Sequence, residues 1–564
     1  MSVSTDPHAV FQQLLDAFRG QMALGGIPGT GDSTTVPSPE MAEMQRNWME
    51  EHAKLWQAFL GRQTDSGEAV AGPEKVRDRR FSHPAWSDSP LHDYLSQAYL
   101  LNARFMSRLV DAVSVRSEAE RQRLRFFSAQ YIEAMAPSNF AATNPEVIQA
   151  ALDSGGESIR QGIQNLLADL DKGRISMTDD GAFEVGRNLA VTPGAVVFEN
   201  EVMQLIQYSP LTEKVGQTPL LIVPPCINKY YILDLQPGNS FVRYAVEQGN
   251  TVFLISWRNV KAEQGNLRWD DYVEQGVLTA LDVVRAVCGT RQANALGFCV
   301  GGTLLATSLA VARGRKQNPV KSLTLLTTFL DFCEPGDLGC YIDEVSVAAR
   351  EATFAKGGIY NGKELASVFS SLRPNDLIWQ YVVGNYLKGG KPPAFDLLYW
   401  NTDPTNLPGP FLVWYLRNMY LENNLRVPGK LTVCGTPVDL RKVDMPAFVL
   451  ATKDDHIVPW RAAYASRQLL TGPTTFVLGG SGHVAGVVNP AHSGKRGYRI
   501  NAEPAADAES WLAGSTEEKG SWWLAWSTWL AGHAGRRIAC RGRLGTSQFP
   551  PIEPAPGRYV KESA

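Results

Sequence analysis

A single cysteine stands where a predicted buried strand turns into a predicted helix. Residues 293–298 form an apolar, strand-like run, and a helical pattern covers residues 303–310, just beyond Cys299. Gly297 and Gly301 lie two residues to either side of the cysteine, and they suit the crowded turn of a nucleophile elbow. The N-terminus of a helix also favours a thiolate and a developing oxyanion. The pattern predicts a nucleophile, and the alternative is a buried structural cysteine beside a glycine turn.

Two loops later in the chain contain candidate catalytic partners for Cys299, an aspartate followed by a histidine. The apolar run 447–451 leads into a loop that contains Asp455, and the run 475–478 leads into a loop that contains His483. The catalytic triad of an α/β-hydrolase has the chain order nucleophile, acid, histidine, with the acid and the histidine on loops after late strands. We therefore expect His483 to take the proton of the thiol while the carboxylate orients the imidazole.

Spacing leaves two choices open in the acid loop. Asp454 and Asp455 are adjacent, and their positions alone do not say which carboxylate pairs with the histidine. His456 follows directly; it is either a second base or a residue that shapes its loop through hydrogen bonds. We favour the supporting role, because the cysteine needs only one histidine and His483 has the expected position.

The oxyanion of the acyl intermediate needs two preorganised donors. The backbone N–H of Val300, directly after the nucleophile, is the first candidate. The second is expected in the loop from Pro224 to Asn228, where the two prolines have no N–H and leave Cys226 or Ile227. Cys226 could itself be a nucleophile, but it lacks an elbow, and we expect it to pack beneath the site.

Strands and helices alternate regularly around the cysteine. Apolar strand-like runs followed by helical patterns are typical of a parallel sheet covered on both faces, an α/β fold; the predicted elements are strands at 220–223, 251–257, 293–298 and 322–329 and helices at 240–248 and 270–287. Two further strands are predicted at 190–192 and 195–198, on either side of a Pro-Gly turn. After Asp331 the alternation stops for roughly 110 residues, far more than an ordinary connection, which predicts a cap over the carboxyl ends of the strands.

The chain is accordingly predicted to have three parts. A mainly helical N-terminal domain covers residues 1–182, with polar linkers near 25–39 and 64–80. The α/β-hydrolase core covers 183–332 and 444–564, and the cap insertion covers 333–443. In the first part we expect a short helix at 11–18 and an amphipathic helix from Met41 to Phe59, whose aromatic stripe packs within the protein. Near the C-terminus we expect the tryptophans to be packing residues, namely Trp522, Trp523, Trp526 and Trp529.

Composition excludes several classes of protein. Among 564 residues, 54 Lys and Arg nearly balance 57 Asp and Glu, which does not support a nucleic-acid-binding surface. The seven cysteines lack paired spacing, so neither a disulfide framework nor a metal site is indicated. There is no run of about twenty apolar residues to span a membrane, and no secretory signal among the first residues. These features favour a soluble, reduced, cytoplasmic protein.

At these residues the chain resembles a known family. The matching segments are 136–140, 223–231, 296–302, 395–401, 455–460 and 482–483. In them the chain is similar to the poly(3-hydroxyalkanoate) synthases, specifically the single-subunit class I type. The first eighty or so residues, with the two linkers, resemble the family least.

The resemblance implies an acyltransferase. Cys299 would carry the growing acyl chain as a thioester, and His483 would activate it. The motif matches the acid to Asp455, which would help to activate the 3-hydroxyl of the incoming monomer. The substrates would be (R)-3-hydroxyacyl-CoA thioesters, expected to be short-chain such as 3-hydroxybutyryl-CoA. CoA is both part of the substrate and a product, and no metal or bound cofactor is implied.

The resemblance also implies partners. It implies a homodimer formed through the cap, association with phasin-type proteins, and attachment to polymer granules in the cytoplasm. The amphipathic helix from Met41 to Phe59 is a candidate for contact with the granule surface. Two rival functions are a hydrolase of the same fold, such as a thioesterase or esterase, and a non-enzymatic granule-binding or scaffold protein. The triad disfavours the scaffold, and the large cap disfavours the hydrolase.

Overall fold

The computed structural model describes residues 39–63, 77–115, 117–503 and 505–564. They belong to two compact units: Met1–Asp179 with Phe369–Pro393, and Asp180–Val368 with Ala394–Ala564. The predicted helix at 11–18 and most of the two predicted linkers, 25–38 and 64–76, lie outside the described residues. The segment 333–443, expected to form one cap, is divided between the units, because its residues 369–393 join the first.

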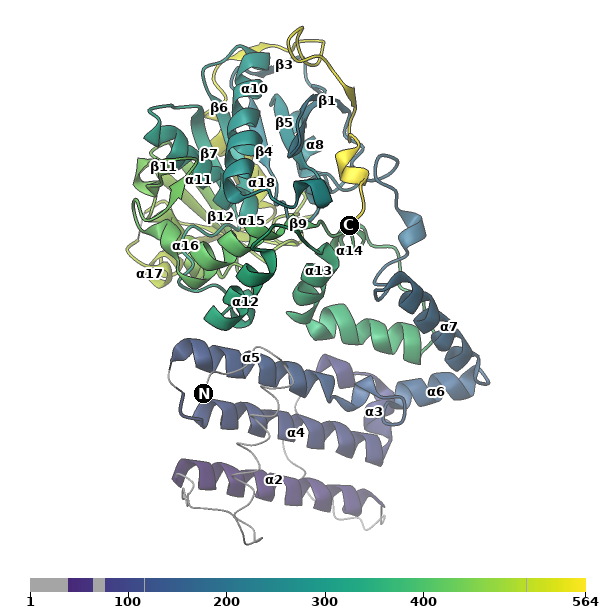
Figure 1. Ribbon diagram of the computed structural model, residues 1–564. Helices are drawn as coiled ribbons and strands as arrows, with labels where there is room; N and C mark the ends of the chain where they lie inside the picture. The colour runs from purple at the N-terminus through teal and green to yellow at the C-terminus, as the bar shows by residue number, and fades with distance from the viewer. Residues whose placement is uncertain (1–38, 64–76, 116, 504) are drawn as a thin grey trace. The chain divides into compact units, whose positions relative to one another are not determined.

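The first unit is helical (Figure 1). The amphipathic helix expected from Met41 to Phe59 is α2, and its aromatic stripe packs on α4, where Trp48 stacks on Phe105 with ring centroids 5.1 Å apart. The helical elements are α2 (Pro39–Gln63), η1 (Arg79–Phe81), α3 (Pro84–Asp88), α4 (Pro90–Ala112), α5 (Glu118–Ala134), η2 (Pro137–Asn139), α6 (Pro145–Asp153), α7 (Glu157–Lys172), η8 (Asn375–Trp379) and η9 (Val382–Leu387).

Residues 369–393, called the excursion below, leave the second unit in sequence and contact α7 of the first unit. Tyr386 donates a hydrogen bond from its hydroxyl to the Asp169 carboxylate (2.7 Å), and Asn165 donates from its side chain to the carbonyl of Asn385 (2.9 Å). A Cβ on Gly162 would lie 1.9 Å from the Tyr386 carbonyl oxygen, so the helix and the excursion approach each other at a residue without a side chain.

The second unit is built on an eleven-stranded mixed sheet in the order β15-β14-β13-β12-β7-β6-β4-β5-β2-β1-β17. From β13 to β5 all neighbours are parallel, and the strands at both edges are antiparallel. The strands are β1 (Gly194–Glu199), β2 (Met203–Tyr208), β4 (Leu220–Val223), β5 (Val252–Trp257), β6 (Ala293–Phe298), β7 (Val320–Leu326), β12 (Ala447–Thr452), β13 (Thr474–Gly479), β14 (Tyr498–Ile500), β15 (Thr516–Glu518) and β17 (Glu553–Pro554).

The predicted parallel core is confirmed, but one predicted edge strand is wrong. Residues 190–192 form no strand; Ala190 has a positive φ of 53°, and its N–H donates to the carbonyl of Asp234 instead. The antiparallel neighbour of β1 is β2, which the sequence did not indicate. In β2 both faces are buried, including Gln204 and Gln207, so it lacks the alternation of apolar and polar residues by which a half-buried strand is recognised.

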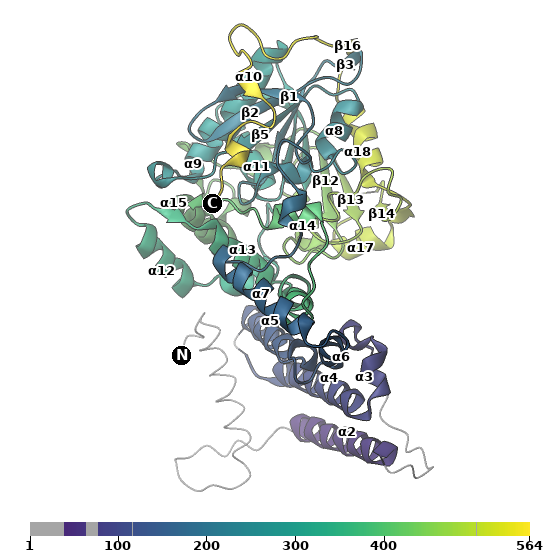
Figure 2. The same cartoon turned by 90° about the vertical axis from the view of Figure 1, so that its right-hand side faces the viewer.

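Helices cover both faces of the sheet (Figure 2). On one face, Phe241 of α8 packs against Trp522, Trp523 and Trp526 of α18, with ring centroids 4.7–5.7 Å apart. These tryptophans are packing residues, as predicted. The helices of this unit outside the cap segment are α8 (Phe241–Glu247), α9 (Trp269–Asp271), η6 (Tyr272–Leu278), α10 (Thr279–Cys288), α11 (Val300–Gly314), α16 (Trp460–Arg467), α17 (Ala508–Ala513) and α18 (Trp522–Ala531).

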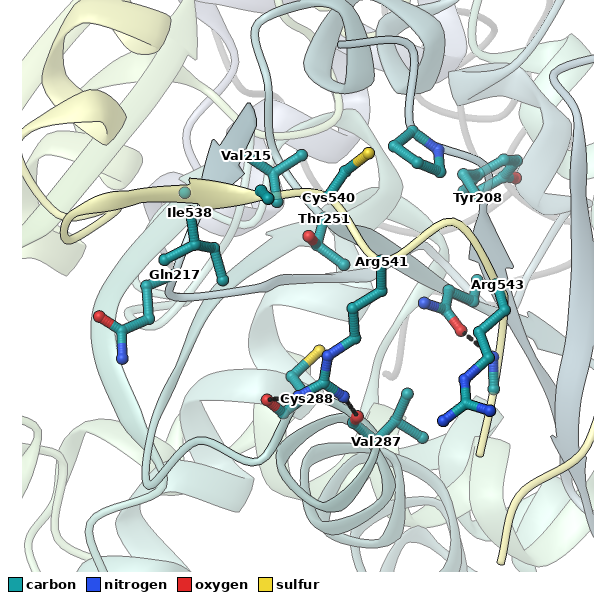
Figure 3. Close-up of a pocket in the computed structure, with 15 residues that line it drawn as sticks. Tyr208, Val215, Gln217, Thr251, Val287, Cys288, Ile538, Cys540, Arg541 and Arg543 are labelled. Atoms are coloured by element: carbon teal, nitrogen blue, oxygen red, sulfur yellow. Dashed lines mark hydrogen bonds between the residues drawn. The ribbon is translucent and has the colours of Figure 1, made fainter. Parts of the chain in front are cut away.

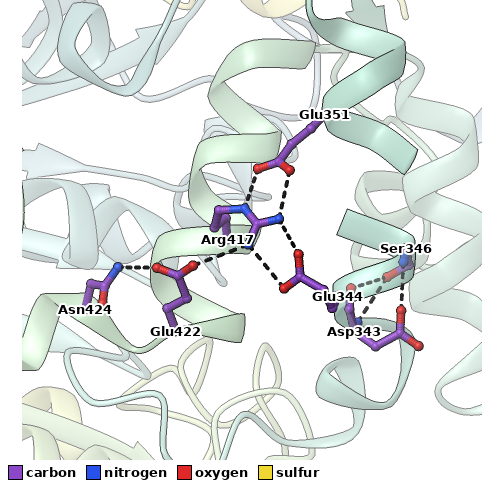
Figure 4. A network of polar contacts seen from close by, with 7 residues as sticks. All are labelled: Asp343, Glu344, Ser346, Glu351, Arg417, Glu422 and Asn424. Carbon is purple, nitrogen blue, oxygen red and sulfur yellow. Dashed lines mark hydrogen bonds and ion pairs between the residues drawn. The ribbon is translucent and has the colours of Figure 1, made fainter. Parts of the chain in front are cut away.

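The remaining cap residues form short elements in the second unit. Arg417 ties two of them together, because its guanidinium pairs with Glu344 and Glu351 of α12 and with Glu422 just after η10 (Figure 4). The elements are α12 (Glu344–Phe354), β8 (Ile359–Tyr360), α14 (Asp396–Asn401), β9 (Leu407–Pro408), α15 (Gly409–Tyr415), η10 (Leu416–Leu421), η11 (Asn424–Arg426), β10 (Thr432–Val433) and β11 (Thr436–Pro437); α13 (Gly362–Ser371) crosses the boundary between the units in sequence.

Candidate active site

Cys299 sits on the turn between β6 and α11 with φ 54° and ψ −130°. A positive φ is unfavourable for a residue with a side chain and persists only where the surroundings impose it. Here the N–H of Cys299 donates to the carbonyl of Leu326 (2.9 Å), and the hydroxyl of Thr328 donates to the carbonyl of Cys299 (3.3 Å). The last residue of β7, Leu326, and Thr328 just beyond it thus hold the turn in the strained backbone typical of a nucleophile elbow.

The glycines beside Cys299 are required by close backbone contacts. A Cβ on Gly297 would lie 2.4 Å from the Cα of Gly302, and a Cβ on Gly301 would lie 2.4 Å from the carbonyl oxygen of Pro224. Real Cβ atoms do not approach other heavy atoms so closely. The elbow is therefore packed directly against the end of β4, where the predicted second oxyanion donor follows.

His483 and Asp455 meet on the loops after β13 and β12. The Nδ1 atom of His483 lies 2.7 Å from Oδ2 of Asp455, and both side chains are buried. The other oxygen, Oδ1, accepts the N–H groups of Ile457 (2.9 Å) and Val458 (2.8 Å). These backbone N–H groups, together with His483, hold the Asp455 carboxylate in a fixed orientation.

The charges around His483 favour its protonated form. Burial alone lowers the pKa of His483, but the negative charges of Asp455 and Cys299 and hydrogen bonds to both outweigh it and raise the pKa to about 10. His483 therefore contacts the Cys299 sulfur on one side and the Asp455 carboxylate on the other. This arrangement favours an imidazolium beside the Cys299 sulfur.

The structure brings Asp455, rather than its neighbour Asp454, to the histidine. Asp454 is exposed, and its N–H donates to the carbonyl of Ser481 (3.0 Å), which joins the two loops. His456 is half-buried, and its carbonyl accepts the N–H of Asp337 (3.0 Å). Both residues therefore make contacts that shape the loops around the Asp455–His483 pair.

The two groups predicted to donate to the oxyanion flank the elbow. Val300 is the first residue of α11, and the N–H of a first helical residue has no partner within its own helix. Cys226 and Ile227 lie in the loop after β4, against whose end Gly301 is packed. Burial, with a further contribution from the charge of Cys299, raises the pKa of Cys226 well above its ordinary value. Cys226 is thus a protonated, buried thiol.

Two other cysteines line a separate small pocket of about 40 Å³ (Figure 3). There Arg541 donates hydrogen bonds to the carbonyls of Val287 (2.7 Å) and Cys288 (3.2 Å), at the C-terminal end of α10. Burial raises the pKa of Cys288 to about 12. Cys540 also lines this pocket, and neither thiol has the elbow geometry of Cys299.

An aromatic group from the cap segment lies beside Cys299. The rings of Tyr415 and Tyr420 are 5.4 Å apart, and Phe332 lies 5.0 Å from Tyr420. Burial, followed by nearby charges that include Cys299, raises the pKa of both tyrosines above the ordinary value. Sequence analysis missed both tyrosines as site residues; the concentration of Trp and Tyr around residue 415 was the available signal.

The assembled groups can perform nucleophilic acyl transfer. A thiol on a strained turn, a histidine and a fixed carboxylate can form and break a covalent acyl intermediate. Among the described residues, no cluster of three or more His, Cys, Asp or Glu side chains is arranged to hold a metal ion. No helix in the described part of the chain is long and apolar enough to cross a membrane.

Two family models match the sequence. Residues 77–245 match the model described as the N-terminus of poly-beta-hydroxybutyrate polymerase (PhaC). Residues 219–490 match the model of the alpha/beta hydrolase fold, which is the fold predicted from the elbow and the order of its partners. The two matches overlap, and together they span residues 77–490, which include parts of both structural units.

Curated relatives match nearly the whole chain. The poly(3-hydroxyalkanoate) polymerase subunit PhaC of Cupriavidus necator is 51% identical over 553 residues, which are 97% of this chain and 92% of the relative. The poly(3-hydroxyalkanoate) polymerase of Methylorubrum extorquens is 42% identical over 94% of this chain and 88% of its own length. The corresponding subunit of Rhizobium meliloti is 39% identical over 93% and 86%.

Proposed function

The chain belongs to the poly(3-hydroxyalkanoate) polymerase family, and on that premise we propose that it transfers (R)-3-hydroxyacyl groups from CoA thioesters onto a growing polyester. One observation carries the mechanism: Cys299 stands on a strained elbow beside His483, which is hydrogen-bonded to Asp455 at 2.7 Å. The proposed chemistry is acyl transfer through a Cys299 thioester.

In the first half-reaction His483 takes the proton of the Cys299 thiol. The sulfur then attacks the carbonyl carbon of the acyl-CoA thioester, and the oxyanion receives hydrogen bonds from the N–H of Val300 and from Cys226 or Ile227. When the intermediate collapses, the bond to the CoA sulfur breaks, and His483 returns the proton to that sulfur. Free CoA leaves, and the acyl group stays on Cys299.

In the second half-reaction a 3-hydroxyl group attacks the acyl group on Cys299. His483, neutral again, removes the hydroxyl proton as the new ester bond forms. The Cys299–acyl bond then breaks, and the sulfur recovers the proton from His483. Each round adds one ester bond and regenerates the thiol, so the chemistry of the chain's own side chains suffices without a bound cofactor.

We propose that Asp455 acts on the hydroxyl through His483 rather than by direct contact. Its oxygens accept hydrogen bonds from Ile457, Val458, His483 and the hydroxyl of Thr452 (3.3 Å). A carboxylate with these partners is well placed to orient the imidazole and to stabilise its charge. The implied activation of the monomer hydroxyl is then a property of the His483–Asp455 pair.

The cap segment supports polymerisation over hydrolysis. A thioester reacts with water as well as with a hydroxyl, so transfer requires that water be kept away. The rings of Tyr415 and Tyr420 are buried close to Cys299, and the buried ring of Phe332 packs against both. An apolar cover of this kind favours the hydroxyl end of an apolar polyester over bulk water.

The family resemblance supports further proposals about substrate and setting. We propose short-chain monomers, such as 3-hydroxybutyryl-CoA, and a homodimer formed through the cap segment. We also propose that the protein binds phasin-type proteins and resides in the cytoplasm on polymer granules. The helix α2 is a candidate for granule contact, since Trp56 and Met49 on it are exposed although Trp48 packs inward.

One assay separates the polymerase from its rivals. The protein is incubated with (R)-3-hydroxybutyryl-CoA, and free CoA and acyl products are measured together. A polymerase releases CoA in step with insoluble polyester, whereas a hydrolase releases soluble 3-hydroxybutyrate. If no CoA appears, both enzymatic functions are excluded and a scaffold function remains.

The nucleophile is tested by substitution at Cys299. Cys299→Ala should abolish CoA release while leaving the thermal unfolding midpoint within a few degrees of the wild type, because only the sulfur is lost. Cys299→Ser should be severely impaired, since a hydroxyl with a far higher pKa is a poor match for a base paired with a thiol. Substantial turnover by Cys299→Ala would move the nucleophile to another residue; Cys226→Ala is the matched control and should retain activity.

A further inference from the structure

Lys229 is a buried lysine in the same loop as the proposed oxyanion donors. It lies two residues after Ile227, its exposed fraction is 3%, and its Nζ donates a hydrogen bond to the carbonyl oxygen of Glu562. Burial lowers the pKa of Lys229, while the charges of Asp403 and Glu562 oppose that shift. A buried ammonium group is costly unless its hydrogen bonds are kept, so this loop is bound to the segment that contains Glu562.

That segment is itself anchored to the core. Tyr559 donates its hydroxyl hydrogen to the carbonyl of Asn200 (2.9 Å), and its N–H donates to the side chain of Gln204 (3.2 Å). Asn259, in the loop after β5, donates from its side chain to the carbonyl of Ser563. Residues 559–563 are therefore held against the ends of β2 and β5, and they give Lys229 a fixed acceptor.

The other side of the loop is held by the cap segment 400–405. The indole N–H of Trp400 donates to the carbonyl of Lys229 (2.6 Å), and the N–H of Thr405 donates to the carbonyl of Ile227 (3.1 Å). The hydroxyl of Tyr231 donates to Asp403 (2.9 Å). The loop thus lies between two fixed segments, and Lys229 is its side-chain link to residues 559–563.

We propose that Lys229 is a positioning residue, which fixes the oxyanion loop by binding the carbonyl oxygen of Glu562. This role rests on the proposed acyl transfer, in which the N–H of Cys226 or Ile227 must meet the oxyanion. Such a donor has to be held within a fraction of an ångström to contribute fully. The loop cannot shift without separating a buried ammonium group from its acceptor, so the lysine resists that displacement.

The direct test is Lys229→Met, which keeps an unbranched apolar stem and removes the ammonium group. We expect kcat for CoA release to fall about 10- to 100-fold, which is at most the decrease caused by removing a whole oxyanion donor. KM should change less than about threefold. Alkylation of Cys299 by iodoacetamide uses the thiol and His483 but no oxyanion hole, so its rate should stay within about threefold. Lys229→Arg should recover part of the lost kcat, because it restores a cationic donor.

The matched control is Lys261→Met. Lys261 pairs with the carboxylate of Glu562 (3.1 Å) from a half-exposed position, and so contacts the same segment without reaching the loop. Its kcat should stay within about twofold of the wild type. A folded Lys229→Met variant with wild-type kcat would overturn the proposal, as would one in which kcat and the alkylation rate fall together.

A second variant keeps the proposal testable if Lys229→Met does not fold. Deletion of residues 562–564 removes the acceptor and should lower kcat to a similar degree, again with near-normal alkylation. If Lys229→Met folds, adding the deletion to it should lower kcat no further. If the decreases in kcat add up, or if the deletion alone leaves kcat normal, the proposed link between Lys229 and Glu562 is refuted. Wild-type protein without CoA release would instead refute the proposed acyl transfer itself.

Discussion

Asp455 and Asp454 are neighbours with different surroundings. Asp455 is buried and accepts hydrogen bonds from His483 and from two backbone N–H groups, whereas Asp454 is exposed. At the scale of single residues, this difference supports Asp455 as the proposed acid, a choice that spacing left open. We expect the proposed reaction to need the negative charge of the carboxylate that orients the imidazole of His483, which is that of Asp455.

Asp455→Asn should therefore be far more damaging than Asp454→Asn. An amide in place of the Asp455 carboxylate can present an N–H to Nδ1 of His483 and favour the wrong tautomer, so kcat should fall by about 10³- to 10⁴-fold. Asp454→Asn should change kcat less than about twofold. Initial rates of CoA release measure both effects, and the reverse order would assign the acid to Asp454.

Asp234 is a second buried carboxylate, remote in role from the proposed chemistry. It is 1% exposed and accepts the hydroxyls of Thr192 (2.5 Å) and Ser240 (2.6 Å). Burial, only partly offset by these hydrogen bonds, raises its pKa to about 6 from an ordinary 3.8. The folded state therefore prefers the protonated form, and the group's contribution to stability is greatest below pH 3.8 and is lost as the pH rises through 6.

Asp234→Asn should remove this pH dependence. The amide oxygen can still accept from Thr192 and Ser240 but cannot ionise, so the variant should gain stability over the wild type as the pH rises from 4 to 7. The total gain is on the order of 3 kcal/mol. Chemical unfolding at several pH values measures it, and a difference that is constant between pH 4 and 7 would contradict the assigned shift.

At the scale of elements, Arg417 connects helices of the cap segment. Its side chain, 23% exposed, pairs with Glu344 and Glu351 of α12 and with Glu422 (Figure 4). It lies on the sequence between Tyr415 and Tyr420, the two aromatic residues beside Cys299. The arginine therefore holds α12 against the segment that carries these two tyrosines.

Arg417→Gln should loosen α12. Three carboxylates would then lose their shared cation and repel one another, so amide hydrogen exchange in residues 344–354 should become faster, and more so at low ionic strength. Arg441→Gln is the control, because Arg441 pairs with Asp439, two residues away, from an exposed position. Unchanged exchange in α12 would show that apolar packing alone holds the helix.

Sequence predicted the elements that follow local rules. The strands that precede Cys299, Asp455 and His483 are short apolar runs that end at glycine or polar residues. Periodicity and chain order were therefore enough to predict that these three residues lie in one site. Tyr415 and Tyr420 could not be placed, because they reach Cys299 from an insertion whose path depends on tertiary packing. The same holds for β2, whose buried glutamines break the pattern of a half-buried strand.

At the scale of the whole molecule, the chain leaves the second unit at residue 369 and returns to it after residue 393. Residues 369–393 depart from the second unit and pack with the first, although residues on both sides belong to the second. Within the first unit the contact depends on Gly162 of α7, where the excursion's backbone at Tyr386 approaches closely. The close contact between α7 and residues 369–393 therefore requires a glycine at position 162.

Gly162→Ala should weaken this contact without disturbing the second unit. The new Cβ would lie 1.9 Å from the carbonyl oxygen of Tyr386, so the excursion must shift, at a cost of about 1–3 kcal/mol typical of overpacking. The hydrogen bonds of Tyr386 to Asp169 and of Asn165 to the Asn385 carbonyl would lengthen or break. Amide hydrogen exchange in residues 382–387 should become faster, and limited proteolysis should cut within 369–393.

Gly384→Ala is the matched control, because a Cβ there meets no atom within 4 Å. It lies in the same excursion, and alanine in place of glycine favours a helical backbone by about 1 kcal/mol, so exchange and proteolysis should stay equal to or slower than in the wild type. The alkylation rate of Cys299 should be the same in both variants, since the elbow belongs to the second unit. Equal protection of residues 382–387 in Gly162→Ala and the wild type would mean that α7 does not hold the excursion.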